Sequence, residues 1–210
     1  MFEIFVDSAA NIPAELVKAF KIKVLSFVNL VNGKEMTCFD PDLTPEEERQ
    51  KGKDYYDMVR AGADIKTGLI SSGVFEDAFR EALEADKDVL YFSLSKNISG
   101  NYNSARIAAE DLMESGNYAR KIRMIDSLNA SLAQGILAIY ASEMREKGMA
   151  FDEVADIFKR SGCRVIRRSE DPEFAGLAEG PAVLLGDTMG EMSLYCALSD
   201  VCITVSYTHL

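Results

Sequence analysis

One stretch decides the fold: Val89-Leu90-Tyr91-Phe92-Ser93-Leu94-Ser95-Lys96-Asn97-Ile98-Ser99-Gly100-Asn101-Tyr102-Asn103-Ser104-Ala105. It begins as an apolar, strand-like run, continues as a serine-rich turn and leads into a helix-like segment over residues 105–113. Backbone amides at the start of a helix have no partner within the helix, so they attract anions. The sequence therefore predicts a strand-to-helix junction whose hydroxyls and amides form a cradle for an anionic group.

A second hydroxyl-rich turn lies earlier in the chain, Lys66-Thr67-Gly68-Leu69-Ile70-Ser71-Ser72-Gly73. A helix-like segment follows it, in which Phe75, Phe79 and Leu83 recur at helical spacing and are expected in the core. Ligands of open α/β sheets bind beyond the carboxyl ends of the strands, and both turns are predicted to share that edge. The alternative is a purely structural role, because Ser and Asn commonly cap helices and glycine eases turns.

Strand-like and helix-like segments alternate along most of the chain. Strands are expected over residues 2–6, 22–31, 89–92 and 122–125, with Asn32-Gly33 as a hairpin turn after the second. Helices are expected between them, including an acidic one that Thr44 and Pro45 start and whose charges need no catalytic role. This alternation predicts an α/β fold with a mostly parallel sheet and helices on both faces.

Composition narrows the class of partner. The net charge of -11 argues against nucleic acid, which is bound through clustered Lys and Arg. We find no apolar stretch long enough to span a membrane and no signal peptide, so the chain is expected to be cytoplasmic and not an integral membrane protein. The four cysteines show no metal-binding spacing, and the single histidine, His209, lies at the very end; no metal and no cofactor are expected.

Four ordered pieces of the sequence together resemble the DegV family of fatty-acid-binding proteins, which includes partner subunits of fatty acid kinase. The resemblance covers residues 2–158. The pieces are Asp7-Ser8; Lys66-Thr67 with Ser71 and Phe75; Ser95 with Ser99-Gly100, Tyr102 and Ala105; and Asp126-Ser127 with Ser131 and Gly135.

The resemblance implies a lipid-binding function without chemistry. It assigns the contacts to a long-chain fatty acid's carboxylate first to Thr67 and Ser99, and then to Ser71, Gly100 and Asn101. Asp7, Ser8, Asp126 and Ser127 are expected in supporting loops, where Asp126 would either cap backbone amides or contact the ligand. A fatty acid kinase, active in phospholipid metabolism, is the implied protein partner.

The last fifty residues do not follow the pattern. Periodicity decays after about residue 158, and the second lobe of the DegV family has no recognisable counterpart. Residues 194–210 resemble sequence found where open reading frames run into library adapters. Residues 159–210 are therefore expected to be an atypical tail of a truncated gene model.

Two other functions remain open. One is a truncated fragment that binds nothing, because a lobe built to pack on another exposes apolar surface when alone. The other is a serine-dependent hydrolase or transferase with Ser99 as nucleophile. That reading needs a base, and Lys96 is the only candidate nearby in a sequence without a Gly-x-Ser-x-Gly elbow.

Overall fold

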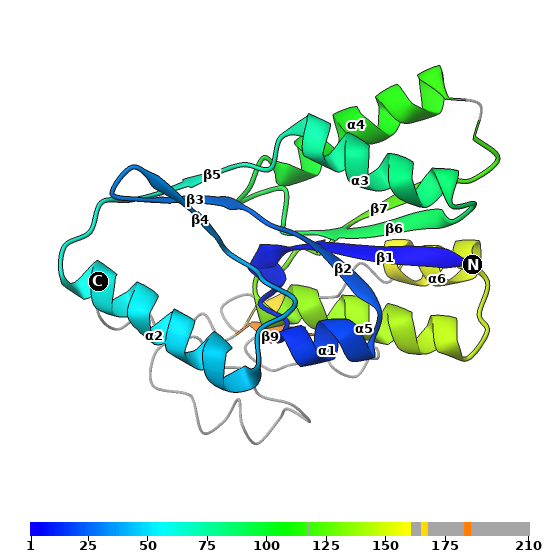
Figure 1. Cartoon of the computed structure of the whole chain (residues 1–210). Coiled ribbons are helices and arrows are strands. Elements are labelled where there is room, and N and C mark those ends of the chain that lie inside the picture. The colour runs from blue at the N-terminus through cyan, green and yellow to red at the C-terminus, as the bar shows by residue number, and fades with distance from the viewer. Residues whose placement is uncertain (117, 161–164, 168–182, 186–210) are drawn as a thin grey trace. The chain divides into compact units, whose positions relative to one another are not determined.

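The computed structural model describes residues 1–116, 118–160, 165–167 and 183–185 (Figure 1). The chain divides into two units, Met1–Arg160 and Ser161–Leu210. In the second unit the described residues form one parallel pair of strands, β8 (Val165–Arg167) and β9 (Val183–Leu185). His209 lies outside the described residues, as do Cys163, Cys196 and Cys202.

A four-stranded parallel sheet forms the centre of the first unit, in the order β2-β1-β6-β7. Its strands are β1 (Phe2–Asp7), β2 (Ile22–Leu25), β6 (Asp88–Ser93) and β7 (Ile122–Asp126). Helices cover both faces (Figure 1), with α3 (Ser72–Glu84) and α4 (Asn101–Ser115) on one and α1 (Ala14–Ala19), α5 (Leu132–Glu146) and α6 (Phe151–Arg160) on the other. The expected α/β fold with a parallel sheet is confirmed.

An aromatic cluster packs between this sheet and α3. Phe75 and Phe79 are fully buried, and their rings lie 5.2 and 6.0 Å from that of Tyr91 on β6. The Phe5 ring of β1 meets Phe79 edge-on at 5.5 Å. Burying each such side chain contributes about 1.5–3 kcal/mol. The helical spacing of Phe75, Phe79 and Leu83 therefore identified core residues correctly, since Leu83 is buried as well.

A second, antiparallel sheet corrects the prediction of one strand over residues 22–31. The chain leaves the parallel sheet after β2 and forms β3 (Val28–Val31), which pairs with β4 (Lys34–Thr37) and β5 (Ile65–Gly68). The break falls at Phe27, whose backbone N–H donates to Ser8 Oγ at 3.0 Å and not to a neighbouring strand. The predicted hairpin turn is present, with Asn32 and Gly33 both at positive φ.

Two element boundaries near the serine-rich turns also differ from the expectation. Thr67 lies in strand β5, opposite Asn29 of β3, so only the residues after Gly68 form the turn into α3. Helix α4 begins at Asn101, four residues before the expected start at Ala105, because Gly100 O already accepts from Ser104 N at 3.0 Å.

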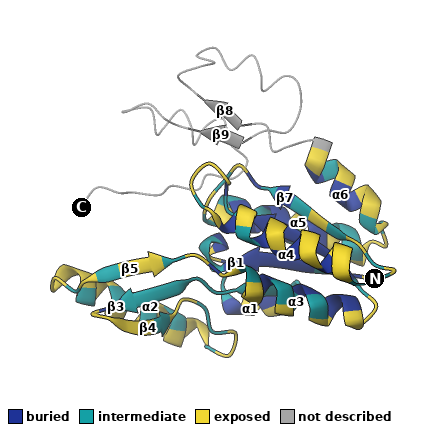
Figure 2. Ribbon diagram, turned by 90° about the horizontal axis from the view of Figure 1, so that it is seen from above, coloured by how far each residue is buried: buried dark blue, intermediate teal, exposed yellow. Residues whose placement is uncertain are grey.

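Helix α2 (Pro45–Arg60) connects β4 to β5 and carries no buried side chain. Thr44 and Glu47 form the capping box expected for its start. Figure 2 shows the contrast between these elements and the parallel sheet: α2, β4 and β5 are largely exposed, whereas β1 is almost wholly buried. No helix among the described residues is long and apolar enough to cross a membrane.

Candidate functional site

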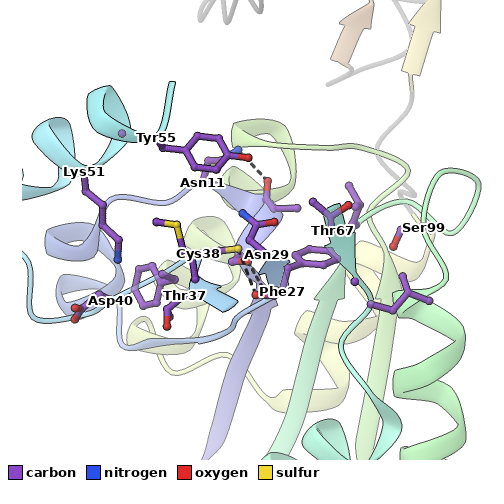
Figure 3. Close-up of a pocket in the computed structure, with 18 of the residues that line it drawn as sticks. Asn11, Phe27, Asn29, Thr37, Cys38, Asp40, Lys51, Tyr55, Thr67 and Ser99 are labelled. Carbon is purple, nitrogen blue, oxygen red and sulfur yellow. Dashed lines mark hydrogen bonds between the residues drawn. The ribbon is translucent and has the colours of Figure 1, made fainter. Parts of the chain in front are cut away.

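A cavity of about 670 Å³ lies beyond the carboxyl ends of β1 and β6, where they meet the antiparallel sheet and α2 (Figure 3). Its walls come from segments far apart in the sequence. The lining residues are Ser8, Ala9, Asn11, Phe27, Asn29, Met36, Thr37, Cys38, Phe39, Asp40, Leu43, Glu48, Lys51, Gly52, Tyr55, Tyr56, Thr67, Gly68, Leu69, Leu94, Ile98, Ser99 and Gly100.

Both principal predicted residues line this cavity. Thr67 is exposed on β5, and Ser99 is half-buried in the loop between β6 and α4. Figure 3 draws both at one end of the cavity. Asp40 and Lys51 are drawn at the other end, and Phe27 lies between the two ends. The sequence therefore identified two hydroxyl groups that the fold brings to one wall.

Ser99 has a hydroxyl suited to donating a hydrogen bond. Its Oγ accepts from Asn101 N at 3.2 Å, which orients the side chain at the start of α4, and within the described part of the chain nothing accepts its proton. The positive end of the helix dipole lies at the same point. The arrangement offers one hydroxyl donor and a favourable potential to an anion.

Gly100 also lines the cavity, and the close packing around it explains why this position has no side chain. A Cβ added there would lie 2.9 Å from Leu69 Cδ1, so the two serine-rich turns are in close contact. Asn101 joins them from behind: it is fully buried, and its Oδ1 accepts from Ile70 N at 3.1 Å. The Asn101 Nδ2 has no hydrogen-bond partner among the described residues.

Two predicted contact residues do not line the cavity, Asn101 and Ser71. Ser71 is the N-cap of α3, where its Oγ accepts from Val74 N at 3.3 Å. Both side chains are thus engaged in holding the turns in shape, and contact with a ligand remains only a prediction for them.

Asp7 organises the loops at the carboxyl edge of the sheet. It is fully buried; Oδ1 accepts from Ala9 N at 3.2 Å and Gln134 Nε2 at 3.1 Å, and Oδ2 accepts from Tyr91 Oη and Leu94 N, both at 2.9 Å. Burial raises the pKa of Asp7, and these hydrogen bonds oppose that rise. One carboxylate thereby connects β1, β6 and α5 beside the cavity.

The other predicted supporting residues also bind backbone groups. Ser8 lines the cavity and fixes Phe27 through the hydrogen bond described above. Asp126 Oδ1 accepts from Lys96 N at 3.2 Å and from Leu128 N at 3.1 Å, and Ser127 Oγ donates to Asn129 O at 3.0 Å. Asp126 and Ser127 do not line the cavity.

Helix α2 supplies a wall that sequence reasoning missed. One face of the helix provides this wall, because each of its residues has a neighbour in the set three or four positions away: Glu48, Lys51, Gly52, Tyr55 and Tyr56. Lys51 is half-buried there, and among the described residues it is the only cation that lines the cavity and it has no ion-pair partner. The tyrosines on this otherwise charged helix were the signal from which its place in the cavity wall could have been predicted.

The surroundings of Ser99 offer little support for nucleophilic catalysis. Lys96 Nζ lies 3.6 Å from Asp126 Oδ2, and an ammonium paired with a carboxylate has no lone pair with which to accept a proton. Over the described ranges, no group of three or more His, Cys, Asp or Glu residues is placed to hold a metal ion. The site is therefore a set of hydrogen-bond donors on the wall of a cavity that both polar and apolar side chains line.

The sequence model of the DegV family of uncharacterised proteins matches residues 1–161. The chain belongs to the DegV family. A DegV domain-containing protein of Clostridium perfringens (strain 13 / Type A) is 36% identical over 154 residues, which are 73% of this chain and 50% of that protein. The chain spans about half the length of that curated DegV relative.

Two solved structures resemble this DegV chain. A DegV family protein from Thermus thermophilus, described by its fatty acid binding, has a TM-score of 0.60 and 27% identity, covering 78% of this chain and 54% of that one. A stearic acid-binding protein from Eubacterium ventriosum has a TM-score of 0.62 and 25% identity, covering 74% of this chain and 51% of that one.

Proposed function

We propose that this chain binds a long-chain fatty acid without covalent chemistry, with the carboxylate at Thr67 and Ser99 and the acyl chain along the cavity. One observation carries the proposal: hydroxyls from β5 and from the β6–α4 loop lie on the wall of one cavity of about 670 Å³. That volume is typical of small-molecule sites. The fatty acid binding of the Thermus thermophilus and Eubacterium ventriosum proteins supports the choice of ligand.

Neutral donors suffice for the carboxylate. Each of its oxygens accepts more than one hydrogen bond, and such charge-assisted bonds are the strong ones. Thr67 and Ser99 each provide a hydroxyl, and Gly100 places backbone, without a side chain, at the positive end of α4. The anion is thus stabilised without a buried countercharge.

The acyl chain is assigned to the apolar part of the wall. Phe27, Met36, Phe39, Leu43 and Leu69 all line the cavity. Transfer of apolar surface out of water stabilises by about 25 cal/mol per Å², so the hydrocarbon chain supplies most of the affinity. The hydroxyls then fix its orientation.

We assign the chain the role of a carrier that presents the fatty acid to a separate fatty acid kinase, which makes the acyl phosphate. The ion pair of Lys96 with Asp126 favours this role over a serine hydrolase, because Ser99 has no adjacent base in the described residues.

Native mass spectrometry of the purified full chain tests binding directly. A retained mass equal to a fatty acid, released by organic solvent, is the expected result. A ligand-free mass that also fails to take up added stearate would refute binding and support the non-binding fragment.

The carrier role needs a separate measurement. The loaded chain, a fatty acid kinase and ATP are expected to give acyl phosphate, trapped as the hydroxamate, only when all three are present. Hydrolysis of an ester probe by the chain alone, lost in Ser99→Ala, would instead favour the hydrolase.

A further inference from the structure

A second, smaller cavity of about 330 Å³ lies beside the first, along the outer edge of β2. Its walls are mostly apolar and include Phe5, Val17, Ile22, Val24 and Ala78. The charged residues that line it, Lys23 and Glu81, pair with each other at 3.0 Å. A space with these walls suits hydrocarbon and has no donor set for a carboxylate.

Phe39 lines both cavities. It belongs to the linker between β4 and α2, in which Leu43 lines only the first cavity and Pro41 only the second. The start of this linker is anchored, because Cys38 N donates to Ser26 Oγ at 3.1 Å and Cys38 Sγ donates to Phe27 O at 3.3 Å. The half-buried Phe39 side chain therefore forms part of the partition between the two spaces.

The linker that carries Phe39 reaches the end of the first cavity remote from the hydroxyls, as the labelled Asp40 shows. Asp40, the next residue after Phe39, is drawn in Figure 3 on the opposite side of Phe27 from Thr67 and Ser99. An acyl chain whose carboxylate is at the hydroxyls and whose tail passes Phe27 therefore runs toward Phe39.

We propose that Phe39 sets the length of the acyl chain that this protein prefers, and that the second cavity receives the terminal carbons of longer chains once the Phe39 side chain is shortened. The proposal rests on the proposed fatty acid binding and adds a residue that determines chain length. Each further methylene of the acyl chain that enters an apolar site raises affinity about fourfold. A methylene that the Phe39 ring keeps out of the second cavity adds no affinity.

Competition on the full chain tests this inference. Parent and Phe39→Ala are each incubated with an equimolar mixture of myristate, palmitate, stearate, eicosanoate and docosanoate, and the bound acids are counted by native mass spectrometry. For the parent, the occupancy is expected to rise with the length of the acid up to one chain length and then to level off. For Phe39→Ala, the ratio of the next longer acid to the acid at which the parent levels off should rise on the order of tenfold, since two more methylenes are buried.

Two variants serve as matched controls, and a third is a substitute for Phe39→Ala. Leu43→Ala shortens a side chain of the first cavity with no second cavity behind it, so it should weaken all five acids without changing their order. Val24→Phe added to Phe39→Ala fills the second cavity and should restore the parental order. Phe39→Leu replaces Phe39→Ala if the latter does not fold.

The outcomes separate the two proposals. Binding by the parent with an unchanged order in the Phe39 variants would overturn the role of Phe39 and leave fatty acid binding intact. An equal shift in Leu43→Ala would overturn it too. Absence of every acid from the folded parent would refute fatty acid binding, and with it this inference.

Discussion

Ser99 and Thr67 are hydroxyl residues in different structural situations. Ser99 Oγ accepts a backbone hydrogen bond from Asn101, whereas the exposed Thr67 side chain makes no hydrogen bond to any described residue. Ser99→Ala therefore removes a local bond as well as a ligand donor, while Thr67→Val removes only the donor. The two variants separate stability from affinity.

Fatty acid affinity should fall about tenfold or more in each of these variants. A hydrogen bond to a charged group contributes roughly 1.5–3 kcal/mol, which corresponds to that factor. Titration calorimetry with oleate measures it. Ser71→Ala is the matched control: it removes a serine that caps α3 and lies outside the cavity, so stability should drop while affinity stays. Unchanged affinity in both variants would place the carboxylate elsewhere.

Asp7 makes stability depend on pH in an unusual direction for a carboxylate. Burial raises its pKa in the folded state above the ordinary value of 3.8, so the folded protein takes up this proton at a higher pH than the unfolded chain. The resulting stabilisation is fully present below pH 3.8 and is lost as the pH rises through the folded-state pKa.

Asp7→Asn removes this titration and serves as the reference. The free energy of unfolding of the parent minus that of Asp7→Asn should grow as the pH falls from neutral, and level off near pH 3.8. Urea unfolding over a pH series measures the difference, in which the titration of other carboxylates cancels. A difference that shrinks as the pH falls would show that the four hydrogen bonds outweigh burial.

Among the elements, those of the parallel sheet were predictable because their signals are local. The apolar runs of β1, β6 and β7 and the helical spacing of Phe75 and Phe79 are legible in short windows. The split of residues 22–31 into β2 and β3 was not, because it depends on a hydrogen bond from Phe27 to Ser8, nineteen positions away. Strand β5 likewise exists through pairing with β3.

The same distinction applies to the cavity. Thr67, Ser99 and Gly100 carried a recognisable pattern and do line it, as does Ser8. Asn101 and Ser71 share that pattern but face other partners, which only the packing of the two turns reveals. The contribution of α2 was missed because most of its sequence is that of a solvated helix, in which Tyr55 and Tyr56 were the sign of a different face.

Helix α2 offers a prediction at the scale of an element. Thr44 Oγ1 accepts from Glu47 N at 3.3 Å, and Glu47 Oε2 accepts from Thr44 N at 2.8 Å. Thr44→Ala breaks this box at a cost of about 1 kcal/mol. Because α2 buries no side chain, the cost should appear as local opening, with amide exchange over residues 46–50 about fivefold faster and β6 unchanged.

Thr44→Ser keeps the capping hydroxyl and is the control for that measurement. Hydrogen exchange followed by mass spectrometry resolves the segment. Equal acceleration in β6 would show that α2 and the parallel sheet open as one cooperative unit.

At the scale of the molecule, exposed apolar side chains gather on loops at the carboxyl edge of the parallel sheet. Leu69, Ile98 and Leu128 are 54%, 66% and 45% exposed, and each lies in a loop that leads into a helix. Apolar side chains grouped in this way favour association. The net charge of -11 opposes it through repulsion between copies.

The first unit contains the whole of the parallel sheet, the aromatic cluster and all the described residues that line the two cavities. A shortened chain, Met1–Arg160, should therefore fold and keep the parent's fatty acid affinity within about twofold, because no contact assigned to the ligand is removed. Its melting temperature, followed by circular dichroism, should lie within a few degrees of the parent's.

Light scattering of the shortened chain at increasing salt separates association from unfolding, since screening weakens the repulsion between copies. A shortened chain that stays monomeric and folded but binds no oleate would show that residues 161–210 supply part of the site.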